Sequence, residues 1–287
     1  MANSNPLTTL CDNLSLLQER RLLSERQNEL AFSMLTEELL AQYPKEMPEE
    51  LYRRFLSLAP FADAVARVRF CMALCRLRPK DTSLSVEELF GINEQPSAGS
   101  HGKIAYVKNR YNEQAFSHFA DLVPNAKPEY ATDFTEACES VYDGRCRYCV
   151  LPVENDVDGR LFRFYAMIDR YELKLCAVTE LENEDSSGSV RYALAGKSSV
   201  RSIPRDRICV LEFSLTREDG SRLSELLSAA KALDATPHTW DFLPLEYDHG
   251  LYRQYVSFRI RRENANAMAL YLSLDYPNYA PIGFYPL

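Results

Sequence analysis

The sequence predicts an α+β protein built from an N-terminal helical segment, one α/β lobe and a C-terminal βαββαβ unit. Three observations support this prediction. Leucines recur at helical spacing through the first part of the chain, a pattern typical of amphipathic helices. From Lys103 onward, apolar strand-like segments alternate with helical ones. After Asp206 the expected order is strand, helix, strand, strand, helix, strand.

The first segment, residues 1–79, is expected to be helical. Helical spacing extends from Leu7 to Leu35, and prolines then separate a second helix over 48–58 from a third over 62–77. The pattern predicts an assembly of three or four helices joined as hairpins. The segment contains no Gly-rich loop and no carboxylate pair at metal-binding spacing.

A connector, residues 80–102, follows the helices. Ser85 and Glu88 form a capping box that predicts a short helix, and Gly91 is expected to end it. The stretch 95–102 is rich in Gly, Ser and Pro, which predicts a domain boundary there.

The third segment, residues 103–205, is expected to form the α/β lobe. Its expected strands are 104–107, 147–152, 173–180 and 190–195, and its expected helices are 113–122, 133–142 and 160–171. Because strands and helices alternate, a mainly parallel sheet is predicted. A polar loop is expected over 182–188.

The last segment, residues 206–287, is expected to have a ferredoxin-like plan. Its expected strands are 208–215, 236–245, 252–261 and 282–285, with helices over 223–233 and 263–272. This βαββαβ order is the signature of that plan.

Charge and hydropathy limit the possible functions. The 287-residue chain carries a formal net charge of -8, which argues against binding a nucleic-acid backbone. No apolar run approaches the ~20 residues of a membrane span, and the first residues have neither the basic nor the apolar region of a secretory signal. We therefore expect a cytoplasmic protein without nucleic-acid or membrane partners.

The eight cysteines are predicted to be packing residues. The sequence has a Cys146–Cys149 pair at CxxC spacing, but no second such pair, and its four histidines are scattered. Strand residues three apart face opposite sides, so this pair chelates metal poorly. No metal and no cofactor are expected, and buried thiols acting as small hydrophobes are the favoured interpretation.

Several of these segments resemble the prephenate dehydratase family. The resemblance rests on 134–144, on 148–155 with Gly159, on Ile104–Val107 as an opening strand, and on Val190–Leu194 at the T-R-F motif. Residues 206–287, ending in Pro281–Pro286, are similar to the ACT regulatory domain that follows the dehydratase unit. The resemblance covers about 103–287.

The resemblance implies a periplasmic-binding-protein-like lobe and a place in aromatic amino-acid metabolism, with phenylalanine as the associated amino acid. The order of segments also resembles bifunctional chorismate mutase–prephenate dehydratase proteins. Over 7–78 that likeness is confined to leucine spacing, and Cys11 stands where the mutase has a substrate-binding arginine. Mutase activity is therefore not expected.

The sequence departs from the dehydratase pattern at its catalytic features. The family has a second lobe before the T-R-F strand, but here only a short acidic loop separates the strand at 173–180 from Val190. Val190 replaces the family threonine and has no proton to give to a departing hydroxyl. The Gly-rich turn is replaced by 108–114, and Asp156 follows Glu154 and Asn155 where a dicarboxylic acid would bind.

Four residues are the candidate ligand contacts: Glu154, Asn155, Arg191 and Asn112. The resemblance places the first three in the dehydratase motifs and Asn112 in the segment that replaces the Gly-rich turn. Arg191 could hold a carboxylate with two hydrogen bonds, or it could form a salt bridge at the end of its strand. No residue is assigned as catalytic.

The resemblance also suggests an effector site in the last segment. The family's G-A-L loop aligns with Gly220, Ser221, Arg222 and Leu223, and its E-S-R-P segment aligns with Asp241. These residues could bind an amino acid between two chains, since helix N-termini favour anions. In the favoured alternative, Gly220 is only a turn glycine and the sheet is a surface for homodimer formation.

Three functions remain open. The first is a catalytically degenerate relative that binds a small aromatic acid or a phenylalanine-like amino acid as a sensor or regulatory partner. The second is an active prephenate dehydratase, converting prephenate to phenylpyruvate, water and CO2, whose cleft is completed by the helical segment or another chain. The third is a structural homo-oligomer without a ligand. The order given is the order of preference.

Overall fold

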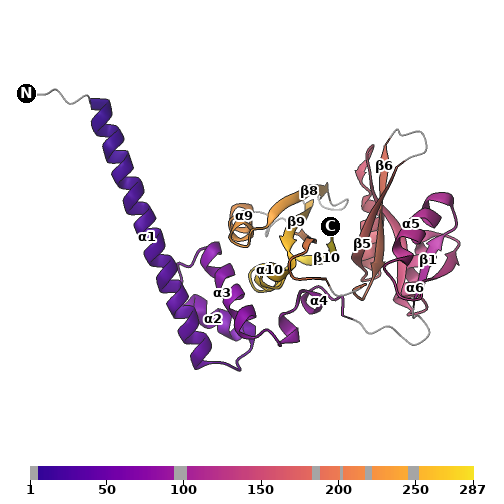
Figure 1. Ribbon diagram of the computed structural model, residues 1–287, viewed down its shortest axis with the longest axis horizontal. Coiled ribbons are helices and arrows are strands. Elements are labelled where there is room, and N and C mark those ends of the chain that lie inside the picture. The colour runs from indigo at the N-terminus through magenta and orange to yellow at the C-terminus, as the bar shows by residue number, and fades with distance from the viewer. Residues whose placement is uncertain (1–5, 94–101, 183–187, 201–202, 217–221, 245–251) are drawn as a thin grey trace, which may run out of the picture.

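A computed structural model describes residues 6–93, 102–182, 188–200, 203–216, 222–244 and 252–287. The molecule is elongated, with a long N-terminal helix at one end and the α/β lobe at the other (Figure 1). The C-terminal unit lies between the helical segment and the lobe, so the last part of the chain forms the middle of the molecule. The predicted α+β class is confirmed.

The N-terminal segment is helical, as predicted. Its helices are α1 (Pro6–Gln42), α2 (Pro48–Leu58) and α3 (Ala64–Leu77). The Asp63 side chain caps α3 by accepting a hydrogen bond from the Ala66 N–H. The assembly is less compact than a hairpin bundle, because only the last turns of α1 pack on α2 and α3. All side chains from 15 to 31 are exposed.

The connector begins with a 3-10 helix η1 (Thr82–Leu84) and a short helix α4 (Val86–Leu89). Ser85 caps α4 by accepting from the Glu88 N–H, and Gly91 follows at φ +67°, both as predicted. The boundary predicted at 95–102 falls almost entirely outside the described residues.

The lobe contains β1 (Lys103–Val107), α5 (Arg110–Ala120), β2 (Lys127–Ala131), α6 (Phe134–Tyr142), β3 (Tyr148–Asn155), β4 (Gly159–Arg160), α7 (Phe162–Arg170), β5 (Lys174–Glu182) and β6 (Ser189–Gly196). Strands β1, β2 and β3 pair in parallel, but β6 pairs antiparallel with both β3 and β5. The predicted mainly parallel sheet is therefore wrong. Because few residues separate β5 from β6, the two strands can only run antiparallel.

Two further differences concern local structure. Strand β2 was not predicted, since its side chains are largely exposed and it contains Pro128, as suits an edge strand. Arg160 was placed in a helix, but it lies in β4, which forms a two-residue hairpin partner to Glu154 and Asn155. Helix α7 begins only at Phe162.

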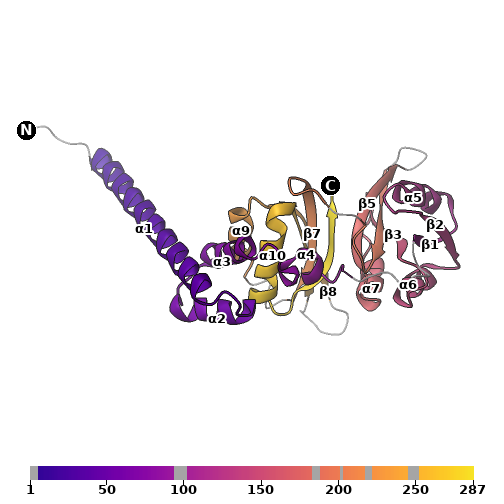
Figure 2. The same cartoon turned by 60° about the horizontal axis from the view of Figure 1, so that its bottom comes forward.

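The C-terminal unit has the expected order of elements: β7 (Ile208–Leu215), α9 (Leu223–Ala232), β8 (Thr236–Pro244), β9 (Tyr252–Arg261), α10 (Arg262–Asp275) and β10 (Ala280–Pro286). The strand order is β10-β7-β9-β8, and all these neighbours are antiparallel. Helices α9 and α10 cover one face of this sheet, and α3 packs on both helices (Figures 1 and 2). The helical segment thus covers the outer side of the C-terminal unit.

One sheet runs through the lobe and the C-terminal unit, in the order β2-β1-β3-β6-β5-β10-β7-β9-β8. The junction is parallel pairing of β10 with β5 at Gly283 and Leu175. A Cβ on Gly283 would lie 2.5 Å from the Leu175 Cβ, so the two strands can approach this closely only with glycine there. The Lys174 Nζ also donates to the Pro281 carbonyl across the junction, at 2.8 Å.

The described cysteines are packing residues, as predicted. Of the seven cysteines whose side chains the structure describes, six are buried and Cys75 is half-buried. Burial raises the pKa of Cys176 to about 12, which keeps this thiol protonated and unreactive. The described residues contain no cluster of metal-binding side chains. No described helix has the length and apolar character that crossing a bilayer requires.

Candidate ligand site at the seam

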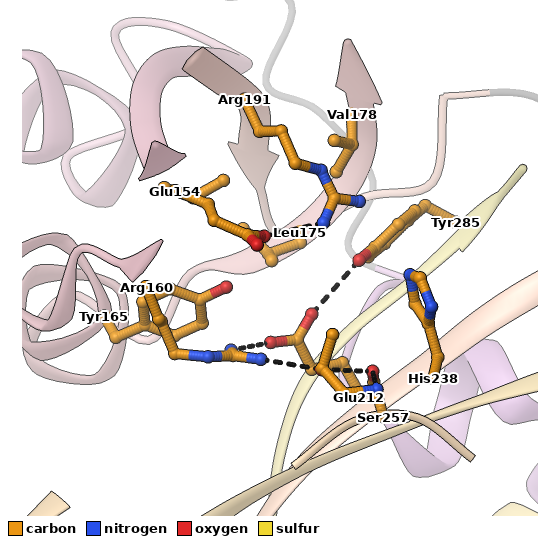
Figure 3. A pocket seen from close by; sticks show the side chains of 12 residues that line it. Glu154, Arg160, Tyr165, Leu175, Val178, Arg191, Glu212, His238, Ser257 and Tyr285 are labelled. Carbon is orange, nitrogen blue, oxygen red and sulfur yellow. Dashed lines mark hydrogen bonds and ion pairs between the residues drawn. The ribbon is translucent and has the colours of Figure 1, made fainter. Parts of the chain in front are cut away.

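The face of the C-terminal sheet that α9 and α10 leave free is turned toward the lobe. Figure 3 shows side chains from both units pointing into the space between them. We call the open hollow here the seam pocket, with a volume of about 350 Å³. It is lined by Glu154, Asn155, Asp156, Glu180, Ser189, Arg191, His238, Arg259 and Leu287. Its size is in the range of small-molecule sites.

Two β-bulges aim side chains at the seam. The register of β3 on β6 shifts between Pro152 and Glu154, and that of β8 on β9 shifts between Pro237 and Thr239. A bulge breaks the alternation of faces along a strand. As a result His238 and Thr239 of β8 both face the lobe, although they are consecutive in the sequence.

A buried ion pair closes the deep end of the seam. The Arg160 guanidinium contacts the Glu212 carboxylate, with side chains only 6% and 3% exposed. Arg160 also donates to Asp241 at 2.9 Å and to Thr239 at 3.0 Å, and Glu212 accepts from the Tyr285 hydroxyl at 3.1 Å. Burial opposes the charge of Arg160, but the neighbouring Glu212 outweighs this effect and the pKa of Arg160 is raised. Neither Arg160 nor Glu212 was among the site residues predicted from the sequence.

Arg191 lies between this cluster and the open pocket. Its Nη1 donates to the Glu154 carboxylate at 2.6 Å, and the two residues are direct neighbours in the register of β6 and β3. The salt bridge considered as an alternative for Arg191 is therefore present. Arg191 also lines the seam pocket, and a guanidinium has five N–H donors, so the ion pair leaves it donors for a second anion.

His238 of β8 and Arg259 of β9 line the pocket from the C-terminal unit. The Arg259 Nε donates to the His238 Nδ1 at 3.2 Å. Burial and the nearby Arg259 and Arg191 lower the pKa of His238, which favours the neutral ring. With Nδ1 accepting, the ring proton is on Nε2. That Nε2 is buried and has no hydrogen-bond partner among the described residues.

The remaining wall carries acceptors. The Glu180 carboxylate accepts from the Ser189 hydroxyl at 2.5 Å, and the Asp156 carboxylate accepts from the Ser189 backbone N–H. Asn155 instead shapes a turn, because its Oδ1 accepts from the Val157 and Asp158 N–H groups. The pocket therefore combines the donors Arg191, Arg259 and His238 with the carboxylates of Glu154, Asp156 and Glu180, and Arg191 lies between Glu154 and Glu180 in the strand register.

The structure separates the other predicted site residues from this pocket. Asn112 is buried in α5, where its Nδ2 donates to the Val107 carbonyl and its Oδ1 has no partner among the described residues. Val190 packs against the hydrophobic cluster that includes Tyr192, whereas Arg191 lines the seam. Val190 and Arg191 point to opposite faces of the sheet because consecutive residues of a strand alternate in direction.

The predicted effector residues are scattered or already engaged. Gly220 and Ser221 lie outside the described residues, and Leu223 is the first residue of α9. Arg222 donates to Asp275 at 2.6 Å and to Glu225 at 2.8 Å. Asp241 accepts from Arg160. Effector binding at these positions stays a prediction.

The comparisons with known proteins agree with this architecture. Residues 107–194 match the model of the family described as prephenate dehydratase. The chain contains a prephenate dehydratase-like domain. The matched segment ends within β6 and includes six of the nine residues that line the seam pocket: Glu154, Asn155, Asp156, Glu180, Ser189 and Arg191.

Solved structures share the fold at low sequence identity. The prephenate dehydratase of Streptococcus mutans has a TM-score of 0.51 and 19% identity, and the match covers 64% of this chain and 97% of that one. GqqA, described as a novel type of quorum-quenching acylase, has a TM-score of 0.50 and 17% identity, covering 66% and 96%. A search of curated proteins found no match. The likeness establishes the fold of the dehydratase-like region.

Proposed function

We propose that this prephenate dehydratase-like protein has lost dehydratase activity and binds a small amino acid in the seam pocket as a sensor or regulatory protein of aromatic amino-acid metabolism. The observation that carries this proposal is the composition of the seam pocket. Its lining combines guanidinium and imidazole donors with carboxylates, as the carboxylate and ammonium of an amino acid require. A phenylalanine-like side chain is what the family resemblance implies.

Loss of catalysis is inferred from two features. Val190 offers no hydroxyl to protonate a leaving group, and its side chain packs into the core instead of the seam. Strands β5 and β6 pair directly up to Glu182 and Ser189, which leaves little chain between them for a second lobe. A cleft that excludes water needs two walls, and here the surface opposite the lobe is the C-terminal sheet.

The charges of the seam pocket favour an amino acid over a dicarboxylate such as prephenate. Arg191 is already paired with Glu154, and Arg259 has no carboxylate partner among the described residues. Asp156 and Glu180 would repel a second carboxylate but would attract an ammonium group. The unpartnered His238 Nε2 would gain a hydrogen bond to the ligand carboxylate, removing the cost of an unsatisfied buried donor. A regulatory ACT-like role for the C-terminal unit is part of this proposal.

The test combines turnover with binding. The protein is incubated with prephenate while phenylpyruvate is followed, and thermal shift is measured with phenylalanine, tyrosine and prephenate. We expect no phenylpyruvate and a saturable stabilisation by an amino acid, weakened at least about tenfold in Arg259→Gln. Arg253→Gln is the matched control, since Arg253 lies on the same strand but pairs with Asp169 away from the pocket.

Each other result selects a different function. Production of phenylpyruvate would show an active dehydratase and overturn the proposal. A flat response to all three ligands would favour the structural homo-oligomer. Equal effects of Arg253→Gln and Arg259→Gln on binding would place the ligand outside the seam pocket.

A further inference from the structure

Helix α1 presents a long face that no other described part of its own chain covers. Its C-terminal turns pack on α2 and α3 through Phe32, Leu35 and Leu39. Farther toward the N-terminus the helix projects away from the body of the molecule (Figures 1 and 2). A projecting helix of this length is unusual in a monomer, because helical stability in water comes largely from packing.

Four apolar side chains lie along one side of this projection. Leu16, Leu23 and Leu30 are spaced by seven residues and Met34 follows, with exposed fractions of 52%, 59%, 63% and 62%. We call these four residues the leucine face. At 3.6 residues per turn they lie on one stripe of the helix, and Phe32 and Leu39 lie on the opposite side. The leucine face therefore points away from the chain's own body.

We propose that the leucine face pairs with the same face of a second copy of this chain, with the two α1 helices antiparallel and crossing at Leu23. In this register Leu23 meets its own equivalent, and Leu16 faces Leu30 of the second copy. Apolar residues spaced by seven keep two helices in contact along a common line. The arrangement places the two molecular bodies at opposite ends of the pair.

The charges beside the leucine face fix the antiparallel direction. Glu19 and Arg26 lie on the same flank of the stripe, and neither forms an ion pair with another described residue. In the antiparallel register Glu19 of each copy comes beside Arg26 of the other, which gives two equivalent ion pairs. A parallel pair would instead place this flank of the two helices on opposite sides of the interface, so that neither ion pair could form. The charge pattern thus selects a second copy as the occupant.

This interface is independent of the proposed ligand site, because α1 does not contact the seam pocket. It also differs from pairing through the C-terminal sheet, in which α1 would remain exposed. The two possibilities make opposite predictions for substitutions on α1.

The first test compares two neighbouring leucines. Leu22 and Leu23 are both 59% exposed, but Leu22 lies about one quarter of a turn away from the leucine face. The full-length protein and its Leu23→Asp and Leu22→Asp variants are examined by light scattering over a concentration series, with circular dichroism to check folding. We expect a dimer whose dissociation constant rises at least about tenfold in Leu23→Asp and is little changed in Leu22→Asp.

The second test uses charge reversal. Glu19→Arg alone and Arg26→Glu alone should each weaken self-association, whereas an equimolar mixture of the two variants should form a heterodimer, because every facing pair is again of opposite sign. A monomeric full-length protein at all concentrations would overturn the proposal. So would a dimer insensitive to Leu23→Asp, or a mixture of the charge variants that does not associate.

Discussion

Two β-bulges and the imidazole of His238, whose Nε2 has no hydrogen-bond partner among the described residues, determine the chemistry of the seam. The bulge beside His238 turns both His238 and Thr239 toward the lobe, so a residue that regular alternation would place on the opposite face lines the pocket. Its ring is held by Arg259 and kept neutral by burial and by two nearby arginines. The position of His238 could not be predicted from the sequence, because the pattern of alternating apolar residues does not show where a bulge occurs.

The lowered pKa of His238 makes stability depend on pH. Because the folded-state pKa lies below the ordinary value of 6.5, the unfolded chain binds more protons as the pH falls through that value. The contribution of a neutral His238 to the free energy of unfolding is therefore present at higher pH and is lost on acidification. We expect the melting temperature to fall between about pH 7.5 and about pH 5.5, and to fall less in His238→Gln. Identical slopes for both proteins would contradict this account.

At the scale of elements, strand β10 holds the two halves of the sheet together. It pairs antiparallel with β7 and meets β5 in parallel at a single register position, Gly283 with Leu175. The strands of each unit were largely predicted from apolar runs and turn residues. Their pairing across units was not, since a contact between residues more than a hundred positions apart has no local pattern.

Gly283→Ala tests the strand junction. The added Cβ would meet the Leu175 Cβ at 2.5 Å and the Leu175 carbonyl oxygen at 2.9 Å, so β5 and β10 must separate. We expect a loss of about 1–3 kcal/mol in the free energy of unfolding, the usual cost of overpacking, measured by urea denaturation. When Leu175→Gly is added, the combined loss should be smaller than the sum of the two single losses. Simple additivity would argue against a contact at this site.

At the scale of the whole molecule, the helical segment and the C-terminal unit share one buried carboxylate. Asp275, at the end of α10, accepts from Tyr52 of α2 at 2.9 Å, from Arg67 of α3 at 3.0 Å and from Arg222 at 2.6 Å. Its side chain is 7% exposed. The sequence predicted each segment but gave no indication of their association, because the partners of Asp275 come from three distant parts of the chain.

Asp275→Ala should loosen the helical segment. Among the described residues, the change leaves Arg67 and Arg222 with only Glu225 as a carboxylate partner, and removing one member of a buried ion pair costs about 3–5 kcal/mol. We expect a fall of that order in the free energy of unfolding and earlier proteolysis between α1 and α3. Asp169→Ala is the control, because Asp169 is 65% exposed in its pair with Arg253 and should change stability by less than about 1 kcal/mol. Equal effects would contradict the role given to Asp275.

Local structure was therefore predicted better than contacts between residues that are far apart in the sequence. The Ser85 cap and the βαββαβ order follow from local rules and were predicted. The residues of the proposed ligand site were predicted only where a family motif named them, as with Glu154 and Arg191. Arg160, Glu212 and Arg259 have no motif, and only the folded arrangement brings them together.

The place of β10 in the sheet has a consequence for biosynthesis. Every other strand of the sheet precedes it in the sequence, so during translation both β5 and β7 emerge from the ribosome well before the strand that will lie between them. Until then each presents an open hydrogen-bonding edge, and such edges can pair with another nascent chain. Productive synthesis thus depends on the lobe and the C-terminal unit staying apart from other copies until their last shared strand has been made.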